Sequence, residues 1–108
     1  MDRITRLIPL KENAEKNTHL EIKVYYSLGG MNYWTGTPEE RGYYISVTPV
    51  IKKGCCTTMT AFSGIKQCMI PCNRQSKKKS EEAANIPQSE YQHLIDRVLI
   101  RNNLEIAE

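Results

Sequence analysis

The sequence predicts an α+β fold, in which an antiparallel β-sheet of three to four strands packs against two C-terminal helices. Two segments alternate apolar and polar residues with a period of two, which is the pattern of half-buried strands. From residue 65 onward, apolar residues recur instead at the three- to four-residue spacing of helices. Strands followed by helices in this order are typical of α+β proteins.

The clearest strand signal covers residues 20–28 and stops at Gly29-Gly30, a pair that readily adopts the positive φ angles that end strand pairing. A second alternating segment covers residues 43–50. These two strands should pair antiparallel because one loop joins them. We also expect a short threonine-rich strand near residues 57–61 and an edge strand from Arg3 to Leu10.

The first helix is expected to follow Ser63 as its N-cap. Apolar residues then recur at positions i, i+3, i+4 and i+7, namely Ile65, Cys68, Met69 and Cys72. Pro71 would kink this helix or begin a second segment after a break. Helical propensity persists through the residues KKKSEEAAN.

The last helix is expected to begin at Ser89, which forms a capping-box pattern with Gln92. Its apolar stripe comprises Tyr91, Ile95, Val98 and Leu99. The pair Asn102-Asn103 can end it.

Length and composition predict one globular domain, residues 1–108, with 40% hydrophobic and 25% charged residues. No uninterrupted apolar run approaches the roughly 20 residues of a membrane-spanning helix, so no membrane association is expected. The start, MDRITRLIPLKEN, lacks the apolar stretch of a signal peptide. We therefore expect a cytoplasmic protein. A homodimer is possible because an open sheet of few strands leaves unpaired edges.

Metal binding and catalysis find little support among the residue types that usually perform them. The cysteines, Cys55, Cys56, Cys68 and Cys72, form a CC pair and a CxxxC pair rather than the CxxC spacing of zinc sites. In a reducing cytoplasm they should be thiols. The two histidines, His19 and His93, belong to no hydrolase or metalloprotease motif. We expect no metal, no cofactor and no enzymatic activity.

The charges divide the chain unevenly. Residues 41–80 contain eight basic residues and no acidic one, whereas the rest of the chain contains seven basic and twelve acidic residues. Such a block either forms a solvated face balanced by acidic neighbours or meets a negatively charged partner, including nucleic acid. The candidate basic surface comprises Lys52, Lys53, Lys66, Arg74, Lys77 and Lys78.

Aromatic residues concentrate around the loop between the two best strands. Six of the eight aromatic residues lie between positions 25 and 44. The rings can pack in the core and strengthen the hairpin, or they can contact a ligand or a partner. The loop Gly29–Gly42 is longer than a chain reversal requires, so we expect the functional surface there. Its candidate binding residues are Asn32, Tyr33, Trp34 and Arg41.

A resemblance to small uncharacterised proteins from phages and mobile elements of gut anaerobes covers roughly residues 20–80. It is carried by the stretches YYSLGGMNYWTGTPEERGYYISVTPV, TAFSGIKQC and NRQSKKK. The resemblance implies a compact accessory protein that acts inside a bacterial host, and it assigns no site residue. Proteins of this kind often act by binding, for example as inhibitors of host defence.

Two functions are consistent with these observations. The first is a non-catalytic inhibitor of host defence, which blocks a defence protein as anti-CRISPR proteins do or sequesters a signalling nucleotide. The alternative is a nucleic-acid-binding accessory protein that uses the basic block 41–80. Steep salt dependence of binding would favour nucleic acid.

Overall fold

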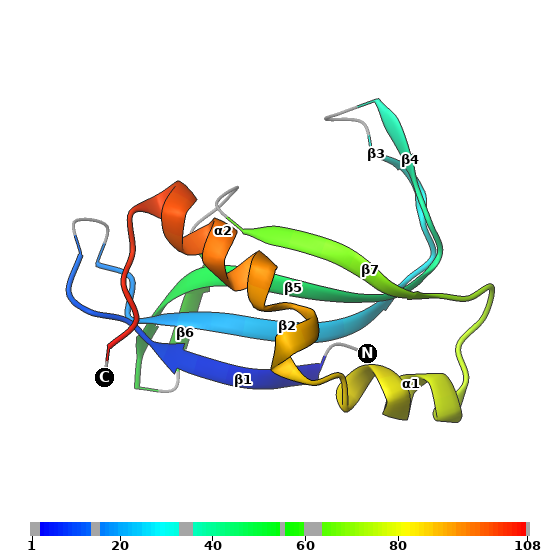
Figure 1. The fold of residues 1–108 in the computed structure, drawn as a ribbon, viewed down its shortest axis with the longest axis horizontal. Coiled ribbons are helices and arrows are strands. Elements are labelled where there is room, and N and C mark those ends of the chain that lie inside the picture. The colour runs from blue at the N-terminus through cyan, green and yellow to red at the C-terminus, as the bar shows by residue number, and fades with distance from the viewer. Residues whose placement is uncertain (1–2, 14–15, 33–35, 55, 60–63, 108) are drawn as a thin grey trace.

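The computed structural model describes residues 3–13, 16–32, 36–54, 56–59 and 64–107. It has the predicted α+β class, with an antiparallel sheet and two helices in the C-terminal part (Figure 1). The strands are β1 (Arg3–Pro9), β2 (His19–Ser27), β3 (Gly30–Asn32), β4 (Thr37–Glu39), β5 (Gly42–Lys53), β6 (Cys56–Met59) and β7 (Ile65–Pro71). The helices are α1 (Lys77–Ala84) and α2 (Gln92–Asn102), preceded by a 3₁₀ turn at Gln88–Glu90.

Strand β5 is the centre of the main sheet, which contains five strands. Its residues 42–50 pair antiparallel with β2, and β1 pairs with the other edge of β2. The second edge of β5 is shared, because residues 42–47 pair with β7 and residues 50–53 pair with β6. The two strands with the clearest alternation in the sequence, β2 and β5, are therefore adjacent and antiparallel, as predicted.

The core lies between one face of this sheet and the two helices. Alternate residues of β2 and β5 point into it, including Ile22 and Val47, which are cross-strand partners and fully buried. Helix α2 contributes Leu94, Ile95 and Val98, each at most 1% exposed. Burying side chains of this size contributes about 1.5–3 kcal/mol each, so α2 is held mainly by its apolar stripe.

The predicted helix from Ser63 through Cys72 is wrong, because residues 65–71 form strand β7. Its pairing with β5 shifts register between Tyr43 and Tyr44, so that Cys68 faces Tyr44 but Ile70 faces Tyr43. Such a bulge breaks the two-residue alternation of the strand, and the resulting apolar spacing imitates a helix. Pro71 ends the strand instead of kinking a helix, and Ser63 lies outside the described residues.

The helix starts also differ from those expected. Helix α1 is capped by Ser76, whose side chain accepts a hydrogen bond of 3.1 Å from the backbone N–H of Lys79. The expected capping box of the last helix does not form, because Ser89 lies in the 3₁₀ turn and α2 begins at Gln92. The end of α2 was predicted correctly, since Asn103 adopts the left-handed conformation there.

Between β2 and β5, the chain leaves the sheet and forms a projecting two-stranded ribbon (Figure 1). Gly30 pairs with Glu39, Met31 with Pro38, and Asn32 with Thr37. We call residues 29–41 the arm. The sequence predicted a long connection here that is not regular throughout, and in the described part of it three residues of β3 pair with three of β4.

Candidate binding surface

The root of the arm is a place where backbones approach closely. Gly29 has a φ of +76°, and a Cβ atom there would lie 2.7 Å from the carbonyl oxygen of Glu39. Gly42 packs against β7, and a Cβ atom there would collide with the carbonyl oxygen of Ile70. Both positions require glycine, so the two ends of the arm are fixed tightly against neighbouring backbone.

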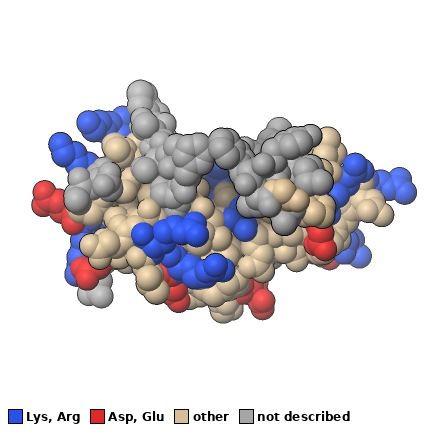
Figure 2. Space-filling view, turned by 90° about the horizontal axis from the view of Figure 1, so that it is seen from above, with Lys and Arg blue, Asp and Glu red and all other residues tan. Residues whose placement is uncertain are grey.

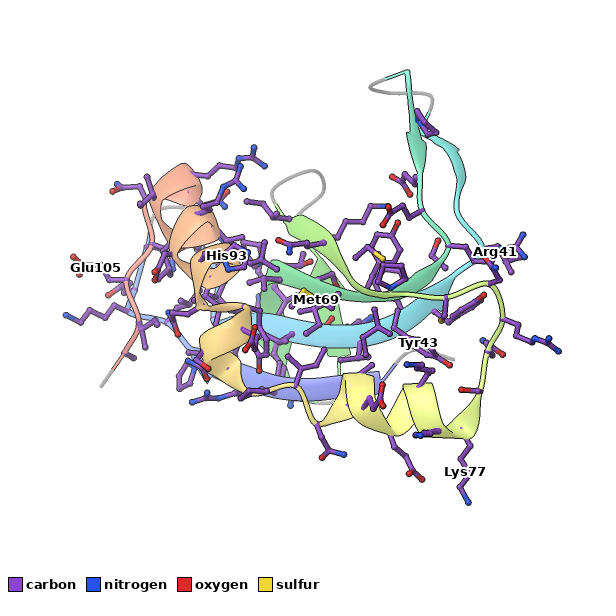
Figure 3. The ribbon with its side chains drawn as sticks, turned by 45° about the vertical axis from the view of Figure 1, so that its right-hand side comes forward. Arg41, Tyr43, Met69, Lys77, His93 and Glu105 are labelled. Atoms are coloured by element: carbon purple, nitrogen blue, oxygen red, sulfur yellow. The ribbon has the colours of Figure 1, made fainter. Side chains whose placement is uncertain are left out.

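Arg41 connects the arm to the segment that leads into α1. Its exposed guanidinium donates from Nε to the carbonyl oxygen of Leu28 at 3.0 Å and from Nη1 to that of Asn73 at 3.2 Å. The backbone N–H of Cys72 donates to the carbonyl oxygen of Arg41 at 3.0 Å. Arg41, expected as a binding residue, is thus positioned at the root of the arm and helps to hold it (Figure 3).

Two tyrosines below Arg41 form one wall of an open cleft. The rings of Tyr26 and Tyr43 meet edge to face, with centroids 5.1 Å apart. The hydroxyl of Tyr43 accepts from the backbone N–H of Ser76 at 3.3 Å and donates to its carbonyl oxygen at 3.2 Å. The cleft has a volume of about 320 Å³ and is lined by Tyr26, Tyr43, Gln75, Ser76, Lys77 and Ser80. Burial raises the pKa of Tyr26, and Cys72 adds to this effect while Arg41 opposes it.

The opposite face of the sheet carries a different cluster beside the arm. Lys66 Nζ lies 5.7 Å from the centroid of the Tyr44 ring and 3.1 Å from the carboxylate of Glu39. Lys66 therefore belongs to an ion pair within the molecule, although the sequence placed it on a basic surface. The thiol of Cys68 is part of the same cluster, and burial, followed by the charge of Glu40, raises its pKa.

The remaining predicted basic residues divide into two groups. Arg74, Lys77 and Lys78 are exposed at the start of α1. Lys52 and Lys53 are exposed at the far end of β5, about 30 Å along the strand from Gly42 at the usual rise per residue. On the face shown in Figure 2, Lys and Arg side chains lie in separate groups at the two ends and near the middle. The structure does not gather the basic block into one surface.

Several other candidates were named from the sequence. Tyr33 and Trp34 lie outside the described residues, and Asn32 is the last residue of β3. Cys68 and Cys72 are free thiols. Within the described ranges, no group of three or more His, Cys, Asp or Glu side chains could hold a metal ion. No helix in the described part of the chain is long and apolar enough to cross a membrane.

The segment from Cys72 to Ser76 joins the arm, the cleft and α1, and of its residues only Arg74 was among the candidate site residues. It receives contacts from Tyr26, Arg41 and Tyr43. Residues 73–76 of this segment form the polar run NRQS, but nothing local in the sequence indicates that β7 brings this run beside the arm.

Comparison with known proteins adds no relative. A scan of protein-family models, a search of curated proteins and a search of solved structures each found no match to this chain.

Proposed function

We propose that this chain is a non-catalytic accessory protein that inhibits a host defence protein by binding it through the arm. The observation that carries this proposal is the projecting β3–β4 ribbon with its fixed root. A binding element held in its bound conformation loses little conformational entropy on association. The resemblance to proteins of phages and mobile elements supplies the biological context of the proposal.

The composition of the arm favours a protein partner over nucleic acid. Residues 29–40 contain Glu39 and Glu40 but no lysine or arginine. Leu28, immediately before the arm, is 70% exposed, and Trp34 and Tyr33 are of the types enriched in protein interfaces. Beyond Arg41 at its root, the arm offers no positive charge to phosphates, whereas its aromatic residues suit an apolar pocket on a protein.

The test compares the wild-type chain with a shortened arm, in which an Asn-Gly turn replaces residues 31–38. Such a turn closes a two-residue hairpin and leaves Gly30 and Glu39 in place. Each tagged protein is expressed in host bacteria and purified at physiological salt, and bound proteins are identified by mass spectrometry. We expect a stoichiometric partner with the wild type and none with the shortened arm, at a similar melting temperature.

A single substitution refines this test. Trp34→Ala should abolish capture of the partner while leaving the melting temperature nearly unchanged. The proposal is wrong if the shortened arm retains the partner. If Trp34→Ala chiefly lowers stability, by the roughly 3–5 kcal/mol typical of emptying a core site, then Trp34 is a core residue and not the main binding residue of the arm.

A further inference from the structure

Helix α1 carries its charges in the order that opposes its own dipole. Its first turn contains Lys77, Lys78 and Lys79 and no acidic residue, and its last turn contains no basic residue. Positive side chains at a helix N-terminus are unfavourable because the backbone there already carries partial positive charge. Lys79 Nζ forms an ion pair with the carboxylate of Glu82 at 3.4 Å. Lys77 and Lys78 form no ion pair with any described residue. The exposed lysines therefore make the start of α1 positively charged and lower the stability of the helix.

Two arginines extend the positive charge from α1 to the root of the arm. Arg74 is exposed beside Asn73, whose carbonyl oxygen accepts from Arg41. In Figure 3, Arg41 lies above Tyr43 and Lys77 lies below it. Tyr43 and Lys77 both line the cleft. We call Arg41, Arg74, Lys77 and Lys78 the cationic end.

We propose that the cationic end binds an acidic segment of the partner protein, with a side chain of that segment seated in the cleft beside Tyr26 and Tyr43. This inference rests on the proposed function, because the same partner would engage the arm and the cationic end. Guanidinium groups hold carboxylates in a planar, two-point geometry, and the exposed Arg74 can do so. Arg41 already donates to the carbonyl oxygens of Leu28 and Asn73, so it contributes its positive charge. The aromatic wall adds contact area next to these charges.

A short acidic polypeptide fits this surface better than a nucleic acid does. The positive charge at the start of α1 is followed directly along the helix by two exposed acids, Glu81 and Glu82. A phosphate backbone repeats its charge at every nucleotide and would continue over these carboxylates. A peptide segment can place its acidic residues within the cationic end alone.

The test measures binding of a fluorescein-labelled peptide of eight glutamates by fluorescence anisotropy, at low and at physiological ionic strength. We expect Arg74→Glu with Lys77→Glu to raise the dissociation constant at least about tenfold. The matched control is Lys52→Glu with Lys53→Glu, which makes the same change in net charge at the far end of β5. This control should raise the dissociation constant of the peptide by about twofold or less. All four side chains are exposed, so both variants should fold, which circular dichroism and thermal melting verify.

Equal weakening by the two charge-reversed variants would overturn the proposal, because overall charge would then explain binding. Tighter binding of a labelled twelve-base-pair DNA duplex than of the peptide would also overturn it. Failure of the proposed function is distinguishable. Peptide binding should be unchanged in the shortened-arm variant. Retention of the cellular partner by that variant would contradict the proposed role of the arm but not the proposal for the cationic end. Undiminished capture of the partner by the variant Arg74→Glu with Lys77→Glu would contradict the proposal for the cationic end but not the proposed role of the arm.

Discussion

Tyr25 of β2 and Tyr44 of β5 are cross-strand partners whose rings stack, with centroids 5.7 Å apart and ring planes at 20°. The next pair along the strands, Tyr26 and Tyr43, meets edge to face. Since successive residues of a strand point to opposite faces, the two pairs brace both faces of the sheet just before the arm begins. The strands that carry the arm are therefore stiffened on both sides.

Alkaline pH is expected to destabilise the protein through Tyr44. Burial, followed by Cys68, Glu39 and Glu40, raises the pKa of Tyr44 above its ordinary value of 10.0. The folded state then holds this proton more tightly, so the associated stability is complete below the unfolded pKa and is lost as pH rises through the folded pKa. Urea unfolding at several pH values between about 8 and 11 measures the loss. Tyr44→Phe should reduce the slope of stability against pH, and an unchanged slope would contradict this prediction.

Replacing Gly29 by alanine should be more costly than replacing Gly54. Both glycines have positive φ, +76° and +61°, but a Cβ atom at Gly54 meets nothing within 4 Å. Gly54→Ala should therefore cost about 1–2 kcal/mol of unfolding free energy for the backbone conformation alone. Gly29→Ala should cost more, because the Glu39 carbonyl must also move. Equal losses in chemical denaturation would show that the close approach at the arm root is unimportant.

The apolar stripe of α2 should account for most of its contribution to stability. Ile95→Ala is expected to lower the unfolding free energy by about 2–5 kcal/mol, because Ile95 is fully buried against the sheet. Ile100 lies on the same helix but is 81% exposed, so Ile100→Ala should change stability by about 0.5 kcal/mol or less. Similar losses for the two variants would mean that α2 packs differently.

Arg41→Ala should loosen the arm as well as impair binding. The substitution removes two hydrogen bonds to backbone carbonyls, those of Leu28 and Asn73, and should cost about 1 kcal/mol of stability because the site is exposed. Faster hydrogen exchange of the arm amides in Arg41→Ala, and not in Arg74→Ala, would support this role. An unchanged melting temperature and unchanged exchange of the arm amides in Arg41→Ala would contradict it.

The homodimer stays a prediction, and sedimentation over a range of concentrations tests it. In β1, the bulge between Ile4 and Arg6, the exposed Arg6 and Pro9 are features that protect edge strands from pairing. Dimerisation through this edge is therefore not expected. A monomer at high concentration would remove the prediction altogether.

Strands β2 and β5 could be predicted because apolar and polar residues alternate over residues 20–28 and over most of residues 43–50. Strand β7 could not, since one bulge next to Tyr44 shifts its apolar residues onto a helical spacing. The arm was found as a candidate surface from the length and aromatic content of its loop. Its fastening to Asn73 and the pairing of Lys66 with Glu39 depend on residues far apart in the sequence, which no local pattern reveals.

The sharing of one edge of β5 has a consequence for synthesis of the chain on the ribosome. The hairpin of β2 and β5 can form as soon as residue 53 has emerged. The partner of residues 42–47 arrives only with β7, whose residues lie between 18 (Val47 to Ile65) and 29 (Gly42 to Pro71) positions further along the chain. During that interval the nascent hairpin exposes an unpaired strand edge, which can recruit other unfinished chains. Aggregation on a crowded polysome is thus the hazard that late emergence of β7 creates, and a slow stretch of translation before residue 71 would increase it.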